Sequence, residues 1–312
     1  MKVLTSLDVI GLGEVCIDWM VYVDRFPEID EKVFVKGYKH FVGGVTANFM
    51  VAFARLGGRG GFLGGVGDDE YGRIVVNKLK NEGVDVSSLK VWSNRSTALN
   101  IVVVDKQGRK YIYQDPNLML NVPEPEDLKE DYITSARHIH TTAIKVETAE
   151  KAFKIALKHG LTTSFDLEKH VSEYGLDGLR EVLKYTHILM PNKLGIQSLT
   201  GERDFIVAAR KIMKYGPKVV VITMGKKGCI VVTEDEVVKS PAFKVNVVDT
   251  TGAGDAFNAA FIYALVVKEW DYERAALFAN AVAALKCARL GAQSSPYLNE
   301  VEGYLKSQGI RL

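Results

Sequence analysis

The segment Asp249-Thr250-Thr251-Gly252-Ala253-Gly254-Asp255 joins a strand-like run, Phe243–Val248, to a long helical stretch. Gly252 and Gly254 allow the backbone to turn tightly and to expose successive N–H groups where the helix begins. These groups and the partial positive charge of the helix start form a site for an anion. Asp255 would lie beside that anion as a general base for an alcohol, which is the chemistry of phosphoryl transfer. The plainer alternative is an N-capped helix whose aspartate only complements the dipole.

Other nucleotide and acyl-transfer motifs do not fit the chain. Gly11-Leu12-Gly13-Glu14-Val15-Cys16 follows a strand-like run, but Cys16 replaces the third glycine of a dinucleotide fingerprint and strand-like residues follow instead of a helix. The sequence contains neither a Gly-x4-Gly-Lys-Ser/Thr phosphate loop nor a Gly-x-Ser-x-Gly elbow. These patterns therefore predict neither a Walker-type phosphate loop nor acyl chemistry.

The composition is that of a globular protein with one large core, or one core and a small satellite. The 312 residues carry a formal net charge of +2, with acids and bases spread along the length, so neither nucleic acid nor a membrane surface is expected as a partner. The N-terminus lacks the long apolar region of a signal peptide, and no apolar run reaches the ~20 residues that span a bilayer. Cys16, Cys229 and Cys287 are far apart among apolar residues, as buried small hydrophobes are. We expect a cytoplasmic protein.

Strand-like and helix-like segments alternate over most of the chain. The predicted strands are Val9–Gly13, Phe62–Val66, His138–Thr142, Thr162–Asp166, Ile188–Met190 and Val219–Thr223. Amphipathic helices are predicted between them, each ending at a glycine that suits a left-handed cap, at Asn48–Leu56, Tyr71–Glu82 and Thr148–His159. The last third is predicted to be helical at Ala253–Val267, Tyr272–Ala288 and Leu298–Lys306. This alternation favours a mostly parallel sheet with helices on both faces.

Two blocks, residues 17–41 and 96–113, interrupt the alternation with strand-like runs that have no helix between them. The runs are Val33–Phe41, Ala98–Val104 and Lys110–Tyr113, and the Lys106-Gln107-Gly108 turn joins the last two as a hairpin. They predict a small antiparallel sheet outside the main one. Such a sheet can serve as a lid over an active site, as an edge extension, or as a dimer interface.

The whole run from Asp249 through Ala256 and Phe257 resembles the signature of the PfkB (ribokinase-like) carbohydrate kinases. The resemblance covers nearly the whole chain, because three further segments match family motifs in the right order. Gly43–Asn48, with Ala54–Gly58 and Gly65–Gly72, is similar to the sugar-site signature, and Thr223–Gly228 resembles the nucleotide-site Thr-x-Gly-x-x-Gly. The resemblance implies a ribokinase-like three-layer α/β fold over residues 1–312, with a mostly parallel central sheet flanked by helices and a discontinuous β lid from about 17–41 and 96–113.

The resemblance also implies roles for individual residues. Asp255 would be the catalytic base, and the anion hole would consist of Gly252, Ala253 and Gly254. The sugar would be held by Asp18, Gly43, Gly44 and Asn48. The nucleotide, ATP with Mg²⁺, would be held by Asn192, Thr223, Gly225, Gly228 and Asn280. A monovalent cation such as K⁺ would be bound by Asp249, Thr251, Gly291 and Ser295.

Three positions depart from the family pattern. The family commonly has Asn-x-x-Glu, where the glutamate organises Mg²⁺ and phosphate, whereas this chain has Asn192 and then Gly195. Cys16 replaces an asparagine that often precedes the aspartate at Asp18, and it is closer to a buried filler than to a hydroxyl reader. The segment Asp166–His170 lacks the arginine that reads a carboxylate in some relatives. Lys145 could replace that arginine, although a solvated surface lysine is the favoured interpretation.

The leading hypothesis is an ATP-dependent kinase that phosphorylates a hydroxyl of a sugar or sugar-like polyol. A nucleoside kinase of the same fold is the second hypothesis, in which an aromatic residue contacts the base, with Trp19, Phe41 and Tyr113 as candidates. A sugar phosphate becomes the acceptor if one of the basic side chains in the lid segments is essential. These side chains are Arg95, Arg109 and Lys110. A protein of another class, a non-catalytic sugar or nucleotide sensor, would explain the missing glutamate but not the intact Gly252–Asp255 segment.

Overall fold

The main sheet, sheet A, consists of eight strands in the order β14-β13-β12-β11-β10-β9-β1-β4 in a computed structural model that describes residues 6–311. Neighbouring strands from β4 to β12 are parallel, while β13 and β14 are antiparallel. The bounds are β1 Val9–Leu12, β4 Gly60–Leu63, β9 His138–Thr141, β10 Thr162–Phe165, β11 Ile188–Leu189, β12 Val219–Thr223, β13 Cys229–Val232 and β14 Val237–Ser240. The predicted mostly parallel central sheet is confirmed.

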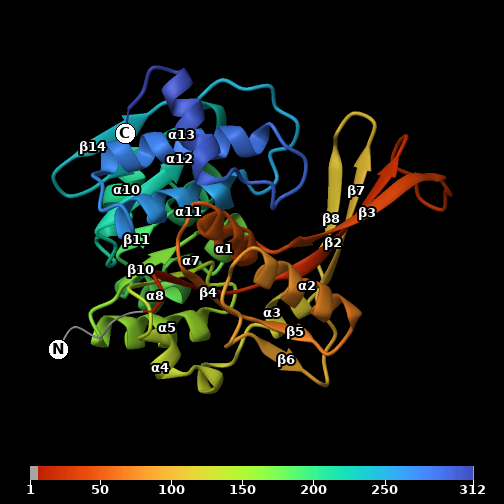
Figure 1. Cartoon of the computed structure of the whole chain (residues 1–312), viewed down its shortest axis with the longest axis horizontal. Coiled ribbons are helices and arrows are strands. Elements are labelled where there is room, and N and C mark those ends of the chain that lie inside the picture. The colour runs from red at the N-terminus through yellow and green to blue at the C-terminus, as the bar shows by residue number, and fades with distance from the viewer. Residues whose placement is uncertain (1–5, 312) are drawn as a thin grey trace.

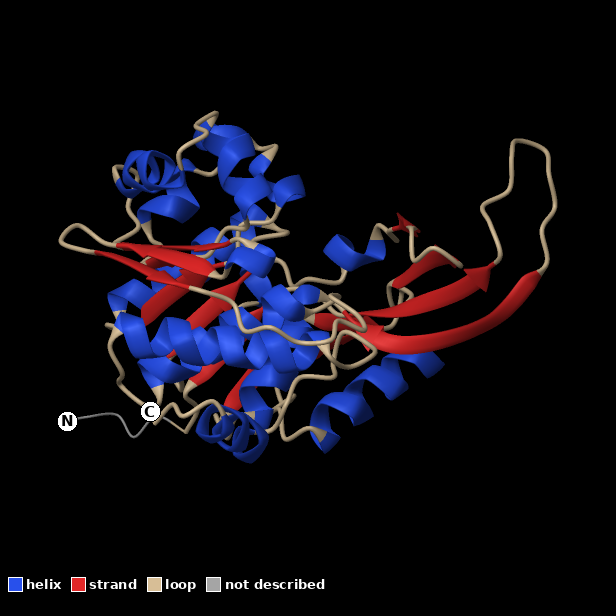
Figure 2. Ribbon diagram, turned by 90° about the horizontal axis from the view of Figure 1, so that it is seen from above, coloured by secondary structure: helices blue, strands red, loops and turns tan. Residues whose placement is uncertain are grey.

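Helices cover both faces of sheet A, because successive residues of its strands point to opposite sides and both sets are apolar. Val219 and Val221 of β12 pack into one buried cluster, whereas Val220 and Ile222 pack into the other. The first cluster includes α1 Val45–Arg55, α2 Glu70–Asn81, α11 Ala253–Val266, α12 Tyr272–Cys287 and α13 Leu298–Ser307. The second includes α5 Val146–Lys158, α8 Arg180–Lys184, α9 Lys193–Thr200 and α10 Phe205–Met213. Figure 2 shows the helices above and below the strands.

A second sheet, sheet B, extends from this body with the strand order β3-β2-β7-β8 (Figure 1). Its strands are β2 Cys16–Val23, β3 Val35–Gly43, β7 Leu99–Asp105 and β8 Lys110–Tyr113. The predicted hairpin between β7 and β8 is confirmed, but the fully antiparallel sheet is wrong because β2 and β7 pair in parallel. The chain leaves the body along β2, returns along β3, and passes through the body before leaving again along β7. The two outgoing strands lie side by side and therefore run in the same direction.

Several smaller elements complete the chain. They are β5 Gly65–Gly67 and β6 Lys90–Trp92, which form a two-stranded sheet, and the short helices α3 Asn117–Leu120, α4 Glu130–Ile133, α6 Lys169–Ser172 and α7 Gly175–Gly178. The single strand predicted at Phe62–Val66 is therefore two strands, β4 and β5, in different sheets. Within residues 6–311, no helix has the length and apolar character needed to cross a membrane.

The predicted helices are confirmed to within a few residues at their ends, and the glycines that end α1, α2 and α5 have positive φ at Gly57, Gly83 and Gly160. The strand-like run Phe243–Val248 does not form a strand, because this segment belongs to none of the three sheets. The backbone N–H of Val248 instead donates to the carbonyl oxygen of Cys287 at 2.8 Å. This bond attaches the segment to the end of α12, directly before the predicted anion site.

Candidate active site

A cavity of about 270 Å³ lies between sheet B and the start of α11. From sheet B it is lined by Asp18, Met20, Phe41, Asn100, Val102, Lys110 and Ile112. From the body it is lined by Glu14, Gly44, Asn48, Glu168, His170, Asp249, Thr251, Gly252, Asp255 and Gly291, among others. The cavity thus brings together the predicted catalytic base and three of the four residues predicted for the sugar site, Asp18, Gly44 and Asn48, which come from distant parts of the sequence.

Asp255 lies in the first turn of α11 and is only 9% exposed. Its Oδ2 accepts a hydrogen bond of 2.7 Å from Nδ2 of Asn48 on α1. Burial raises the pKa of Asp255 to about 7, the charges of Glu168 and Glu14 act in the same direction, and the bond from Asn48 partly opposes them. The carboxylate can therefore gain and lose a proton near neutral pH, as a general base must.

The turn before α11 has the geometry that its glycines predict. Gly252 is the N-cap in the left-handed conformation, at φ 78°, and a β-carbon there would overlap the backbone of Ala292. A β-carbon at Gly254 would meet no atom within 4 Å, so this residue leaves open space at the helix start. The N–H of Ala253 donates to the carbonyl oxygen of Thr250 at 3.2 Å and closes the turn. The fourteen-residue helix α11 adds its dipole to this site.

Asp18 stands on β2 beside Phe41 of β3 and Asn100 of β7, and the three share the inner face of sheet B. Oδ1 of Asp18 accepts hydrogen bonds from Asn100 Nδ2 at 3.0 Å and from Cys16 Sγ at 3.4 Å. Burial raises the pKa of Asp18, and both bonds oppose that rise. Gly43 has no room for a side chain, because a β-carbon would overlap the Asp18 carboxylate. The glycine thus exposes the carboxylate to the cavity.

Carboxylates dominate the polar lining of this cavity. Glu14 is buried and accepts bonds from the hydroxyls of Thr46 at 3.2 Å and Thr142 at 2.7 Å. Glu168 carries a pKa raised by burial and lies 3.4 Å from Nδ1 of His170. Lys110 is the one lysine or arginine among the lining residues that the structure describes. The cavity is therefore suited to hydroxyl groups more than to anions.

Three of the predicted nucleotide-site residues lie together in a groove at the start of α9. Thr223 and Gly225 line this groove with Asn192, Lys193 and Lys226. Gly228 has a φ of 86°, and a β-carbon there would overlap the backbone of β14. Asn280 does not line the groove, because it is buried and its Nδ2 donates to the carbonyl and hydroxyl oxygens of Ser240 at 3.1 and 3.0 Å.

The missing glutamate at Gly195 has a steric explanation. Gly195 packs on the preceding loop so closely that a β-carbon would lie 2.5 Å from the carbonyl oxygen of Leu167. Oδ1 of Asn192 caps α9 by accepting the Gly195 N–H at 2.8 Å. Among residues 6–311, no group of three or more His, Cys, Asp and Glu side chains is arranged to hold a metal ion.

Three of the four residues predicted for a monovalent cation, Asp249, Thr251 and Gly291, are close together, but most of their oxygens are already bonded. The Asp249 carboxylate accepts bonds from N and Oγ1 of Thr251 at 2.9 and 2.7 Å and from N of Gly291 at 2.9 Å. Burial disfavours the charged form of Asp249, but these bonds outweigh it and its pKa lies below the ordinary value. The carbonyl oxygen of Asp249 accepts a bond of 2.8 Å from Nζ of Lys286. The hydroxyl of Ser295 is buried and has no partner among the described residues.

The lysine and arginine side chains expected near the substrate differ in where they point. Arg109 pairs with Asp105, and Arg95 lies over the ring of Trp92, so neither lines the cavity. Lys110 does line it, and its Nζ lies 3.4 Å from Oγ1 of Thr251. Lys145 pairs with Glu124 at 2.5 Å and its side chain is 15% exposed, so the prediction of a solvated surface lysine is wrong. Its charge is balanced by Glu124.

Sequence reasoning missed three functional candidates: Asn100, Glu168 and Lys286. Each had a signal, since Asn100 and Lys286 are isolated polar residues in apolar runs and Glu168 follows a strand end. A buried polar group needs a partner, and that requirement points to a local role.

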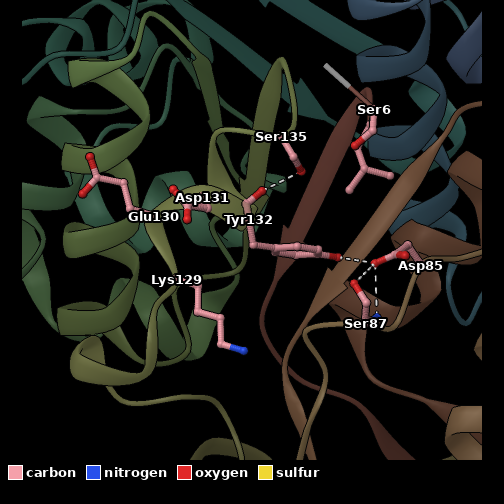
Figure 3. Close-up of a pocket in the computed structure, with 9 residues that line it drawn as sticks. Ser6, Asp85, Ser87, Lys129, Glu130, Asp131, Tyr132 and Ser135 are labelled. Atoms are coloured by element: carbon pink, nitrogen blue, oxygen red, sulfur yellow. Dashed lines mark hydrogen bonds between the residues drawn. The ribbon is translucent and has the colours of Figure 1, made fainter. Parts of the chain in front are cut away.

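A second cavity lies beside the starts of β1 and β9, and Figure 3 shows its lining. Three of its side chains bond to one another: the Tyr132 hydroxyl donates to Asp85 at 2.8 Å, and the Ser87 hydroxyl donates to the same oxygen at 2.7 Å. None of the predicted site residues lines it. The arrangement is that of a structural network.

A parallel α/β body, a second sheet over its cavity, and a buried carboxylate at a glycine-rich helix start define a small-molecule kinase. Residues 6–298 match the model of the pfkB family of carbohydrate kinases, and the chain belongs to this family. It is 32% identical over 302 residues to the ATP-dependent ribose-1-phosphate kinase of Halopiger xanaduensis, covering 96% of this chain and 98% of the relative.

Solved structures agree on the fold. Ribokinase from Thermotoga maritima matches with a TM-score of 0.86 and 30% identity, over 96% of this chain and 99% of that chain. A structure from Escherichia coli in complex with ATP and Mg²⁺ matches with a TM-score of 0.83 and 25% identity, over the same shares of the two chains. The predictions of a ribokinase-like fold and of a carbohydrate kinase are confirmed, and the sensor interpretation loses its support.

Proposed function

We propose that this carbohydrate kinase transfers the γ-phosphoryl group of ATP to a hydroxyl of an uncharged sugar or polyol, with Asp255 as general base. One observation carries the proposal: the buried Asp255 carboxylate is held by Asn48 in the cavity that lies between the start of α11 and Asp18 of sheet B. A hydroxyl held by Asp18 would lie in the same cavity as the base.

In the proposed step the acceptor hydroxyl gives its proton to Asp255 as its oxygen attacks the γ-phosphorus. The bond between that phosphorus and the bridging β–γ oxygen breaks, and ADP leaves with that oxygen. The turn would bind the transferring group through the N–H groups of Gly252 and Gly254 and the dipole of α11, which favours the negative charge of the transition state, whereas the Ala253 N–H already donates to Thr250. Oδ1 of Asn48 is buried without a partner among the described residues, and it would accept a bond from the acceptor.

The charge of the cavity supports an uncharged acceptor. Glu14, Asp18, Glu168, Asp249 and Asp255 all line it, so a phosphate or carboxylate on the acceptor would be repelled. Hydroxyl groups would instead donate to these oxygens. The second candidate is a sugar phosphate, which Lys110 favours because it is the cation that reaches the cavity and because one relative is a ribose-1-phosphate kinase.

A nucleoside is a weaker candidate acceptor. Of the three aromatic residues expected to contact a base, Phe41 lines the cavity. Trp19 instead stacks on Tyr38 and donates to the hydroxyl of Tyr71, and Tyr113 lies on the exposed face of sheet B. The nucleoside hypothesis therefore depends on Phe41.

A panel experiment tests the proposal. ADP release from MgATP would be measured with neutral sugars, polyols, sugar phosphates and nucleosides at equal concentrations, and the product would be checked by mass spectrometry. We expect neutral sugars or polyols to give the highest kcat/KM. Preference for a sugar phosphate that disappears in Lys110→Met would establish the second candidate in place of the first.

We propose that ATP lies in the groove formed by Thr223, Gly225 and Asn192, with Asn280 behind it, and that Mg²⁺ is held mainly by the phosphates and water. Mg²⁺ would supply charge neutralisation to the phosphates. The E. coli structure with ATP and Mg²⁺ supports both ligands. The expected K⁺ is not part of this proposal, because Lys286 already bonds the Asp249 carbonyl oxygen.

We also propose that residues 1–312 form one domain with sheet B as its lid.

We propose further that the chain forms a homodimer in the cytoplasm. The face of sheet B turned away from the cavity exposes Tyr38, Ile101, Tyr111 and Tyr113, an apolar surface that a second copy would cover. The free thiols of Cys16, Cys229 and Cys287 agree with a reducing compartment. Sedimentation of the wild type and of Tyr38→Glu/Tyr113→Glu tests the dimer, since the double variant should sediment as a monomer.

A further inference from the structure

Lys286 is a buried lysine beside the candidate active site. It lies in the last turn of α12, its exposed fraction is 0%, and its Nζ donates to the carbonyl oxygen of Asp249 at 2.8 Å. A lysine at the end of a helix normally remains in water, as Lys158 of α5 does with a side chain that is 70% exposed. Burial of an ammonium group is costly without oxygen partners and a balancing charge, so its place here needs a reason.

The surroundings of Lys286 supply that balancing charge. Burial lowers the pKa of Lys286, and the charges of Asp249 and Asp255 oppose this effect by favouring the ammonium form. The bonded carbonyl belongs to the segment that continues through Thr251 to the N-cap Gly252 of α11. The lysine thus reaches from α12 to the loop that positions the proposed anion hole.

A potassium ion does not fit this loop together with Lys286. Potassium is held by backbone carbonyl and other oxygens, and the Asp249 carbonyl oxygen is already bonded to an ammonium group that carries the same charge. Two cations at one carbonyl would repel each other strongly at this depth. The Asp249 carboxylate is also occupied, by bonds from Thr251 and Gly291. Of the oxygens expected to bind a monovalent cation at Asp249, Thr251, Gly291 and Ser295, those of Asp249 are therefore already occupied by hydrogen bonds within the chain.

We propose that the ammonium group of Lys286 is a built-in monovalent cation that holds the Asp249–Gly252 loop in place and makes this kinase independent of K⁺. Lys286 is a positioning residue: it acts through the Asp249 carbonyl oxygen and does not line the substrate cavity. The inference rests on the proposed role of the Gly252–Gly254 turn. The melting-temperature measurements described below need no acceptor, so they remain valid if the proposed acceptor is wrong.

The first experiment uses the wild-type protein in buffers whose only cations are Mg²⁺ and tetramethylammonium. Addition of K⁺ to about 100 mM should change kcat by less than about twofold, and the melting temperature should not respond specifically to K⁺, because Lys286 already holds the Asp249–Gly252 loop. A severalfold activation by K⁺, or a rise in melting temperature with K⁺ that tetramethylammonium does not reproduce, would overturn the proposal. This experiment needs no variant and therefore holds even if the variants do not fold.

The second experiment compares two substitutions that differ in the space they leave. Lys286→Ala removes the ammonium group and leaves room for an ion, so kcat should fall by roughly 10²-fold and recover in part with K⁺, which should also raise its melting temperature. Lys286→Met removes the charge but fills the space, so its loss of activity should not be reversed by K⁺. Lys158→Met is the matched control and should behave as the wild type. A folded Lys286→Ala with full activity in tetramethylammonium, or with a loss that K⁺ does not reverse, would contradict the proposal.

Discussion

Nδ2 of Asn48 donates to Oδ2 of Asp255 at 2.7 Å, although the two residues are 207 positions apart in the sequence. The bond links α1, which follows the glycine pair at Gly43 and Gly44, to the first turn of α11. It fixes the orientation of the carboxylate and leaves Oδ1 of Asn48 buried without a partner among the described residues. One asparagine thus connects the proposed base with the residues proposed to hold the acceptor.

Substitution of the base separates chemistry from binding. Asp255→Asn should lower kcat by roughly 10²–10⁴-fold, because the acceptor hydroxyl loses its proton acceptor, while acceptor affinity changes little. Steady-state kinetics and calorimetric titration with the best acceptor of the panel measure the two quantities. Asp177→Asn, at a side chain that is 95% exposed, is the control. Unchanged turnover in Asp255→Asn would remove the residue from the mechanism.

The raised pKa of Asp255 predicts an acidic limb in the rate profile. Because a base must be deprotonated, kcat/KM should be half-maximal near the pKa of about 7, should level off about one pH unit above it and should fall on its acid side. The Glu168 charge contributes to this raised pKa, so Glu168→Gln should move the limb to lower pH. An acidic limb that stays in place in Glu168→Gln would assign it to another group.

The same pKa has a consequence for stability. A carboxyl whose folded-state pKa lies above its unfolded value binds protons more tightly when folded, so it favours the folded state at low pH, and this contribution is lost as pH rises through about 7. Asp255→Asn removes the buried charge and should therefore raise the melting temperature at pH 8 relative to the wild type, with a smaller difference at pH 5. Thermal unfolding at the two pH values measures this. A larger gain at pH 5 than at pH 8 would reverse the predicted sign.

Asp18 should affect binding more than turnover. Asp18→Asn keeps the shape but removes the charge that accepts hydroxyl hydrogen bonds, so KM for the acceptor should rise by roughly 10–100-fold with a smaller change in kcat. ATP affinity should stay the same, because Asp18 does not line the Thr223 groove. Asp24→Asn, at an exposed residue just after β2, is the control. Equal effects on KM for ATP and on KM for the acceptor would contradict the assignment of Asp18 to the acceptor site.

The start of α9 should affect Mg²⁺ use and stability separately. Asn192→Ala loses the cap of α9, which should cost about 1 kcal/mol of unfolding free energy, and it should raise the Mg²⁺ concentration for half-maximal activity. Asn192→Asp keeps the cap and separates the two effects. Mg²⁺ titrations and chemical denaturation provide the measurements. A Mg²⁺ titration that is the same in Asn192→Ala as in the wild type would count against any metal role for this residue.

The sequence by itself determined the class of fold and the positions of the local turns. Apolar strands alternating with amphipathic helices predicted the parallel sheet, and the glycines at Gly57, Gly83 and Gly160 predicted helix ends, because both depend on neighbouring residues. Gly252 is a further case, since its left-handed conformation and the long helix after it follow from the local sequence. The resemblance of the motifs added the family, and family membership is confirmed.

Only the tertiary structure decided which distant groups meet. The parallel pairing of β2 with β7 depends on the chain passing through the body between them, and the steric need for Gly195 depends on the carbonyl of Leu167. The bonds from Asn48 to Asp255 and from Lys286 to Asp249 join residues whose spacing in sequence carries no signal. Packing of α1, α11 and α12 on one face of sheet A brings these residues together, and such packing is a property of the whole chain rather than of any segment.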